Sequence, residues 1–152
     1  MNQDLKIEET FNLAVKNHIK NNLKEAQDLY NQVLKTNPNH LNALNNLGGL
    51  FKQLGKTEKA KNFYDKTIQI NPNFADGHNN LGITYRELGD RQKAVSCYKK
   101  AIEINPNFIN AHYNLGMIYR ELGDHQKAMS CYKKAIEINP NHINSYNNLG
   151  IV

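Results

Sequence analysis

A fixed spacing of 34 residues constrains this chain more than any other feature. Residues 75–108 and 109–142 are identical at 25 of 34 positions without a gap. The four prolines keep the same spacing, each within an Asn-Pro-Asn triplet, at Pro38, Pro72, Pro106 and Pro140. Because self-similarity at a fixed period of this size marks a repeat architecture, the sequence predicts an array of similar units.

Each unit carries the pattern of two amphipathic helices. In residues 75–108 the first helix is expected over 75–88, where His78, Leu81 and Tyr85 fall on one face. The second is expected over 92–104, with Ala94 and Tyr98 on its packing face. Proline resists helix interiors and pushes the preceding residue towards extended geometry, so each Asn-Pro-Asn is expected to end a helix.

The turn inside each pair has its own signals. A glycine follows a leucine at Gly55, Gly89 and Gly123, the usual arrangement for a left-handed residue that closes a helix. Asp90 and Asp124 come next and are expected to cap the following helix through its free amides. In residues 41–74 we expect Thr57 to be the cap.

These motifs together resemble the tetratricopeptide repeat. The shared residues are Leu-Gly-x-x-Tyr, then Gly-Asp, then Ala-x-x-x-Tyr-x-x-Ala and a proline, at a period of 34. His78 and His112 depart from the family, which often has tryptophan at that place. The resemblance implies an all-α, right-handed superhelical solenoid of antiparallel helix pairs, whose first helices line a concave groove.

The repeat boundaries follow from this resemblance. The whole chain, 1–152, is expected to form one array, with repeats at 41–74, 75–108 and 109–142. A degenerate repeat is expected at 7–40, and 143–152 begins a fifth that stops inside its first helix. Because repeats bury their apolar faces against neighbours, the uncapped end at Leu149 to Val152 predicts that the chain is a piece of a longer array or of a larger protein. An end exposed in this way is expected to be able to stack on another copy.

One asparagine recurs at the same place in every repeat. The column consists of Asn12, Asn46, Asn80, Asn114 and Asn148. An amide side chain both donates and accepts hydrogen bonds, so it can pair with a peptide backbone of any sequence. Helices pack about 8–10 Å apart and an extended chain advances about 3.3 Å per residue, so the column predicts a grip on about every third peptide residue.

This column resembles the asparagine ladder of O-linked N-acetylglucosamine transferases, which holds substrate peptides by their backbones. The alternative interpretation is that asparagine is common here and satisfies local backbone groups. Other residues expected on the groove face are Asn45, Asn79, Tyr113, Lys52, Arg86 and Arg120. The arginines suit a carboxylate or phosphate, but Glu87 and Glu121 lie beside them and favour mutual neutralisation.

Two functions from different classes remain open on the sequence. The first is a scaffold that binds a protein or an extended peptide in the groove. The second is the N-terminal, substrate-recruiting array of a larger glycosyltransferase or sulfotransferase, which the opening pattern around His18 and Glu25-Ala26 resembles. A structural spacer without a ligand is a third interpretation.

Composition argues against other classes of protein. The net charge of +5 comes from 19 basic and 14 acidic residues, without a basic stripe interleaved with aromatics, so nucleic-acid binding is not expected. Cys97 and Cys131 lie one period apart without metal-ligand spacing, and no phosphate-binding loop is present, so we expect no enzyme, cofactor or metal. Since no signal peptide or membrane span is found, a cytoplasmic location is expected.

Overall fold

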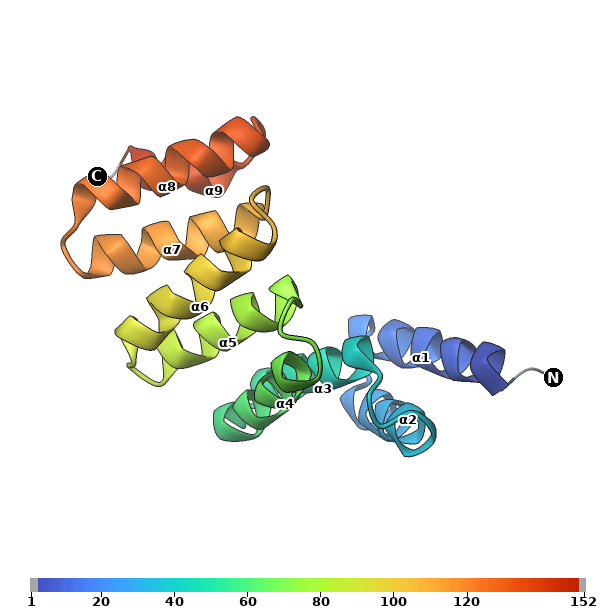
Figure 1. Cartoon of the computed structure of the whole chain (residues 1–152). Coiled ribbons are helices and arrows are strands. Elements are labelled where there is room, and N and C mark those ends of the chain that lie inside the picture. The colour runs from blue at the N-terminus through green and yellow to red at the C-terminus, as the bar shows by residue number, and fades with distance from the viewer. Residues whose placement is uncertain (1–2, 151–152) are drawn as a thin grey trace. The chain divides into compact units, whose positions relative to one another are not determined.

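The computed structural model describes residues 3–150, which form nine α-helices and no β-strand. The chain divides into two compact units after Pro72. The first unit contains α1 (Gln3–Ile19), α2 (Leu23–Thr36), α3 (Leu41–Gln53) and α4 (Thr57–Ile70). The second contains α5 (Ala75–Glu87), α6 (Arg91–Ile104), α7 (Ile109–Glu121), α8 (His125–Ile138) and α9 (Ile143–Leu149) (Figure 1).

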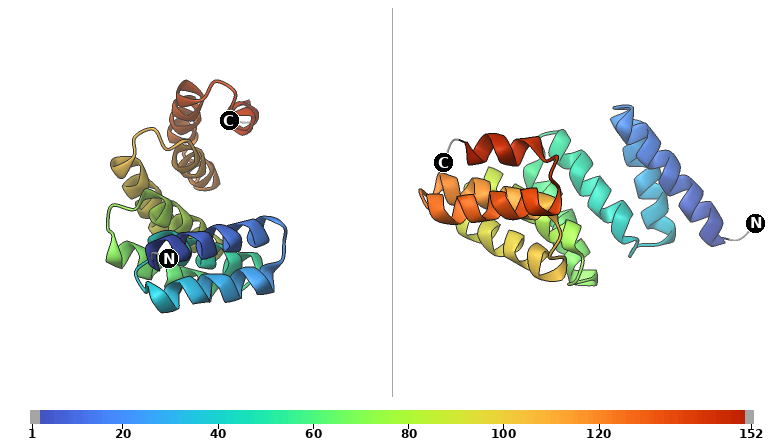
Figure 2. Two further views of the ribbon diagram at one scale, coloured as in Figure 1. Left: turned by 90° about the vertical axis from the view of Figure 1, so that its right-hand side faces the viewer. Right: turned by 90° about the horizontal axis from the view of Figure 1, so that it is seen from above.

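Consecutive helices pack as antiparallel pairs within each unit. The pairs are α1 with α2, α3 with α4, α5 with α6 and α7 with α8 (Figure 1). In the second unit α6 also packs on α7, and α8 on α9, which Figure 2 shows side by side. The predicted all-α class of stacked helix pairs is thereby confirmed, and the helices predicted over 75–88 and 92–104 end or begin within one residue of α5 and α6.

The glycine turns take the predicted conformation. Gly55, Gly89 and Gly123 have φ of 70°, 84° and 78°, the left-handed region that a side chain rarely adopts. The equivalent residue of the first pair is Asn21, whose φ of 63° makes it the one non-glycine residue with positive φ among residues 3–150. Asparagine tolerates this conformation, so the first pair keeps the same turn without a glycine.

Two of the three predicted helix caps are confirmed. The side chains of Asp90 and Asp124 accept hydrogen bonds from the backbone N–H groups of Lys93 and Lys127. These bonds, together with those from the two lysine side chains, lower the pKa of both carboxyls. The prediction for Thr57 was wrong, because Thr57 is already the first residue of α4 and the capping place falls on the preceding lysine.

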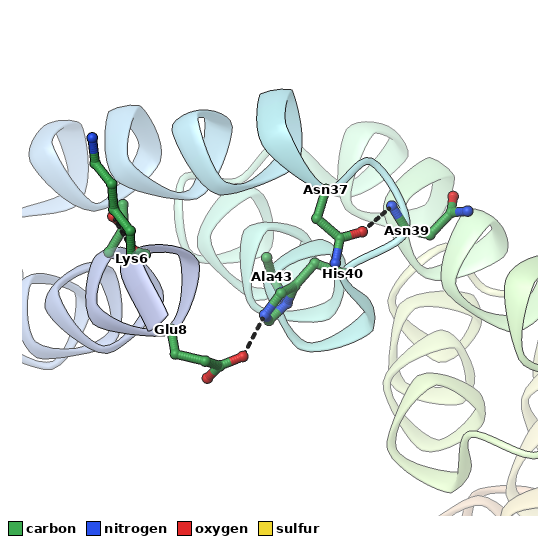
Figure 3. Close-up of polar contacts among 7 residues, drawn as sticks. Lys6, Glu8, Asn37, Asn39, His40 and Ala43 are labelled. Atoms are coloured by element: carbon green, nitrogen blue, oxygen red, sulfur yellow. Dashed lines mark hydrogen bonds and ion pairs between the residues drawn. The ribbon is translucent and has the colours of Figure 1, made fainter. Parts of the chain in front are cut away.

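Each Asn-Pro-Asn triplet ends a helix as predicted, and the first asparagine of the triplet has a second role. In the first triplet the Oδ1 atom of Asn37 accepts the backbone N–H of Asn39 at 3.2 Å (Figure 3). His40 follows and caps α3, since its Nδ1 atom accepts the N–H of Ala43 at 3.1 Å. The other ring nitrogen of His40 lies 3.3 Å from a Glu8 carboxylate oxygen on α1 (Figure 3). Short side-chain bonds therefore fix the chain direction between pairs.

In the pairs α3–α4, α5–α6 and α7–α8, a tyrosine on the second helix packs against a glycine on the first. In α1–α2 the place of this glycine is taken by Ala14. A Cβ atom added to Gly82 would lie 2.6 Å from Cε1 of Tyr98, closer than atoms can approach. The same distance recurs at Gly116 with Tyr132. The tyrosines are fully buried, so the glycine is required by the close approach of two helices.

The tyrosine hydroxyls differ in their hydrogen bonding. The hydroxyl of Tyr30 lies 3.3 Å from Nδ1 of His18. Those of Tyr98 and Tyr132 are buried and make no hydrogen bond within residues 3–150. Burial raises the pKa of Tyr98, against the opposing influence of the Arg86 guanidinium. A buried hydroxyl without a partner destabilises the folded state, so these two tyrosines contribute to stability through the packing of their rings.

The last helix, α9, is the expected beginning of a further repeat. Its residues Ile143 and Tyr146 are 70% and 50% exposed. Ile151 and Val152 of the end expected to stack on another copy lie outside the described residues. Self-association through this end stays a prediction.

Adjacent glycines on α3 test the close helix approach. Gly48→Ala should destabilise the protein by about 1–3 kcal/mol, because its Cβ would lie 2.6 Å from the Tyr64 ring. Gly49→Ala, whose Cβ would be 3.7 Å from the Tyr64 hydroxyl, should be neutral or stabilise by up to about 1 kcal/mol. Urea unfolding measures both, and equal effects would contradict the packing argument.

The tyrosine hydroxyls make a second test. Tyr98→Phe removes a buried hydroxyl that has no partner. The free energy of unfolding should stay unchanged or rise, by at most about 3 kcal/mol. Tyr30→Phe removes a bonded hydroxyl and should cost about 0.5–1.5 kcal/mol. Thermal and urea unfolding should therefore show a loss of stability for Tyr30→Phe and none for Tyr98→Phe. A loss of stability in Tyr98→Phe would show that its hydroxyl has a partner.

Candidate peptide-binding surface

The asparagine column lies on the first helix of every pair. Asn12 is on α1, Asn46 on α3, Asn80 on α5, Asn114 on α7 and Asn148 on α9. Asn12 is exposed, and the other four are partly buried. Their equivalent helical positions follow from the 34-residue period, but burial already shows that these side chains also contact the protein itself.

In the second unit two of the column asparagines, Asn114 and Asn148, bond to the preceding first helix. The Nδ2 group of Asn114 donates to Oδ1 of Asn79 on α5 at 3.1 Å. The Nδ2 group of Asn148 donates to the hydroxyl of Tyr113 on α7, also at 3.1 Å. Asn79 and Tyr113 occupy the same place in successive repeats, so the two bonds are equivalent. The column therefore joins one repeat to the next.

Two residues that sequence analysis placed on the groove face serve this packing. Asn79 is only 5% exposed, since the following pair covers it and its oxygen is taken by Asn114. The ring of Tyr113 lies 6.0 Å from that of Tyr132 and 5.3 Å from that of His142. Asn79 thus orients Asn114 and presents little surface of its own to a ligand.

The two arginines of the surface have partners in the next repeat. The Nε atom of Arg86 lies 3.3 Å from a carboxylate oxygen of Glu121, and Arg91 contacts the other oxygen at 3.4 Å. Arg120 donates to Oδ1 of Asn148. The neutralisation expected from the sequence is present for Arg86, although its partner is Glu121 of the following repeat.

The first unit has a related arrangement around Tyr30. Burial raises the pKa of Tyr30, and the nearby Asn46 side chain opposes this effect. His18 bridges from Tyr30 to Oε1 of Gln53, which lies 3.2 Å from its Nε2 atom. Sequence analysis found no role for His18. Asn45 and Lys52, also expected on this surface, are partly buried on α3.

One hydrogen-bonding atom of the column remains available. Within residues 3–150 the Oδ1 atom of Asn114 accepts no hydrogen bond, while its amide nitrogen is held by Asn79. An amide oxygen can accept up to two hydrogen bonds. The arrangement therefore presents an oriented acceptor suited to a peptide N–H.

The described residues offer no reactive constellation. No group of three or more His, Cys, Asp or Glu among residues 3–150 is placed to hold a metal ion. His112 is 8% exposed and its Nε2 atom lies 2.8 Å from the carbonyl oxygen of Pro106, a packing role. Burial raises the pKa of Cys131 to about 11, against a lowering by Lys99, so its thiol stays protonated near neutral pH. None of the helices within 3–150 is both long and apolar enough to cross a bilayer.

The tetratricopeptide repeat model matches residues 41–74, 75–108 and 109–142. These matches cover more than half of the chain, so the chain belongs to the tetratricopeptide repeat family. With its stacked helix pairs it is a repeat scaffold for protein–protein interaction. A comparison with curated proteins found no match.

Solved structures of MamA are similar to this chain. One, described as the crystal structure of MamA, has a TM-score of 0.79 and 29% identity over 91% of this chain and 81% of that one. A second has a TM-score of 0.80 and 28% identity over 95% and 79%. A MamA fragment from Desulfovibrio magneticus RS-1, at 21% identity over 90% and 77% with a TM-score of 0.76, shares the fold.

The Asn114–Asn79 bond can be tested by a double-mutant cycle. Asn79→Ala and Asn114→Ala should each destabilise the protein, with a coupling energy of about 0.5–1.5 kcal/mol, because either change removes the same bond. Urea unfolding of both single variants and the double variant measures the coupling. Asn110→Ala, at an exposed position on α7, is the matched control and should change stability by less than about 0.5 kcal/mol.

Proposed function

We propose that the protein binds an extended peptide segment of a partner along its first helices, with the asparagine column holding the peptide backbone. The observation that carries this proposal is the hydrogen bonding of the Asn114 side chain. Its nitrogen is fixed by Asn79 while its oxygen accepts nothing within residues 3–150. A side chain held in place loses little conformational freedom on binding, which favours affinity.

The chemistry of the surface favours recognition of the main chain. An amide oxygen accepts a backbone N–H whatever side chains the peptide carries. Arg86 is already paired with Glu121, so it does not present an unpaired charge to a ligand carboxylate. The resemblance of the column to the asparagine ladder of O-linked N-acetylglucosamine transferases supports the same mode of binding.

The other functions expected from the sequence receive less support. No observation within the described residues favours a transferase, and the similar structures reported above are of MamA. Neither Cys97 nor Cys131 is part of a disulfide, and we include a reducing, cytoplasmic location in the proposal.

Mutation of the column tests the proposed function. A peptide array first supplies a binding sequence, whose affinity is then measured by fluorescence anisotropy. Asn80→Ala combined with Asn114→Ala should weaken binding at least about tenfold, since about 1.4 kcal/mol of lost hydrogen bonding corresponds to that factor. Asn62→Ala, at an exposed position of α4, is the control and should bind as the unmodified protein does.

The ligand provides a second arm of this experiment. N-methylation of the peptide backbone removes the N–H donors and should abolish binding, whereas exchange of side chains along the peptide should be tolerated. Circular dichroism confirms that the double variant is folded. Unchanged affinity in a folded double variant would overturn the backbone-holding role.

A further inference from the structure

A cleft on the second unit is distinct from the asparagine surface. Residues of α6, α7 and α8 line it, and its volume is about 500 Å³. Ile102, Leu115 and Cys131 form an apolar floor. Ligand pockets typically occupy roughly 300–1,000 Å³ and are mostly apolar with a few placed polar groups, and this cleft meets both conditions.

The cleft and the asparagine column lie on different sides of α7. His112 and Leu115 line the cleft, while Asn114 bonds to Asn79 on α5. Around the helix axis, His112 is about 200° and Leu115 about 100° away from Asn114. A ligand in the cleft therefore does not compete with a peptide held by Asn114.

The floor of the cleft lies beside His112, which also lines it. The Nε2 atom of His112 is held 2.8 Å from the carbonyl oxygen of Pro106. Leu115 is 5% exposed and Cys131 is 9% exposed, so both contribute surface to the floor. The floor is therefore apolar, and the one acidic residue that lines the cleft, Glu137, is paired with Lys134.

Two lysines on different helices flank this floor. Lys99 comes from α6 and Lys133 from α8, and both are exposed. Neither makes an ion pair with another residue within 3–150, whereas the neighbouring Lys134 is paired with Glu137 at 2.9 Å. Two unpaired cations beside an apolar floor are complementary to an apolar group that has carboxylates next to it.

We propose that this cleft is a second docking site, which takes an acidic segment of a partner protein and buries one of its apolar side chains between Lys99 and Lys133. The cleft is open to solvent along one side, so it cannot enclose the greater part of a small molecule as ligand pockets do. A protein segment needs only one side chain to be enclosed. The attraction between the lysines and the acidic side chains of the segment guides its approach and sets its orientation, and the apolar contact adds affinity.

The probe for this site is a fluorescein-labelled peptide with one central leucine between aspartates and glutamates. Lys99→Glu with Lys133→Glu should weaken its binding at least tenfold in an anisotropy titration. Lys24→Glu with Lys66→Glu changes the net charge equally at exposed positions of the first unit and should have a much smaller effect. Equal losses in the two variants would show a general charge effect and overturn the proposal.

The peptide and the floor of the cleft give independent readouts. Replacing the central leucine by serine should also weaken binding, and retention of full affinity would overturn the apolar contact. In a Cys97→Ser background the peptide should slow iodoacetamide alkylation of Cys131 at alkaline pH, and an unchanged rate would place the peptide elsewhere. Asn80→Ala with Asn114→Ala should leave this binding unchanged, which separates the outcome from that of the proposed function.

Discussion

The close contact between a glycine on the first helix and a tyrosine on the second is the interaction on which the three repeats at 41–74, 75–108 and 109–142 depend. At Gly48, Gly82 and Gly116 the partner ring fills the space of a missing side chain. This brings two helices closer than ordinary side chains permit, and it buries a large ring in each pair. This contact also positions the polar side chains on the first helix, because they can form an ordered row only if the opposite face of that helix is fixed.

Polar contacts between repeats then decide which groups of the first helices are available. Asn114 and Asn148 each bond to the preceding first helix, and Arg86 bonds to Glu121 on the following one. Such bonds have a structural consequence, since they join one repeat to the next. They also have a functional one, since a side chain with one end fixed presents its other end in a defined direction.

The two faces of the second unit suit different chemistry. On one face of α7 the available atom is the amide oxygen of Asn114, which is neutral and suited to main-chain recognition. On the other, an apolar floor lies between the cationic side chains of Lys99 and Lys133. A scaffold with both surfaces can contact one partner at two places or two partners at once, and linked contacts raise the overall affinity beyond that of either alone.

The 34-residue period alone determined the helix pairs, the left-handed glycines and the aspartate caps, because these depend on local backbone geometry and hydrogen bonds within a few residues. The sequence also placed the asparagines in one column. It did not show that Asn79 is buried, that the partner of Arg86 is Glu121, or that His18 contacts Tyr30. Those contacts join residues 12 or more positions apart in the chain, so only the packing of helices against one another, within a pair or between pairs, decides them.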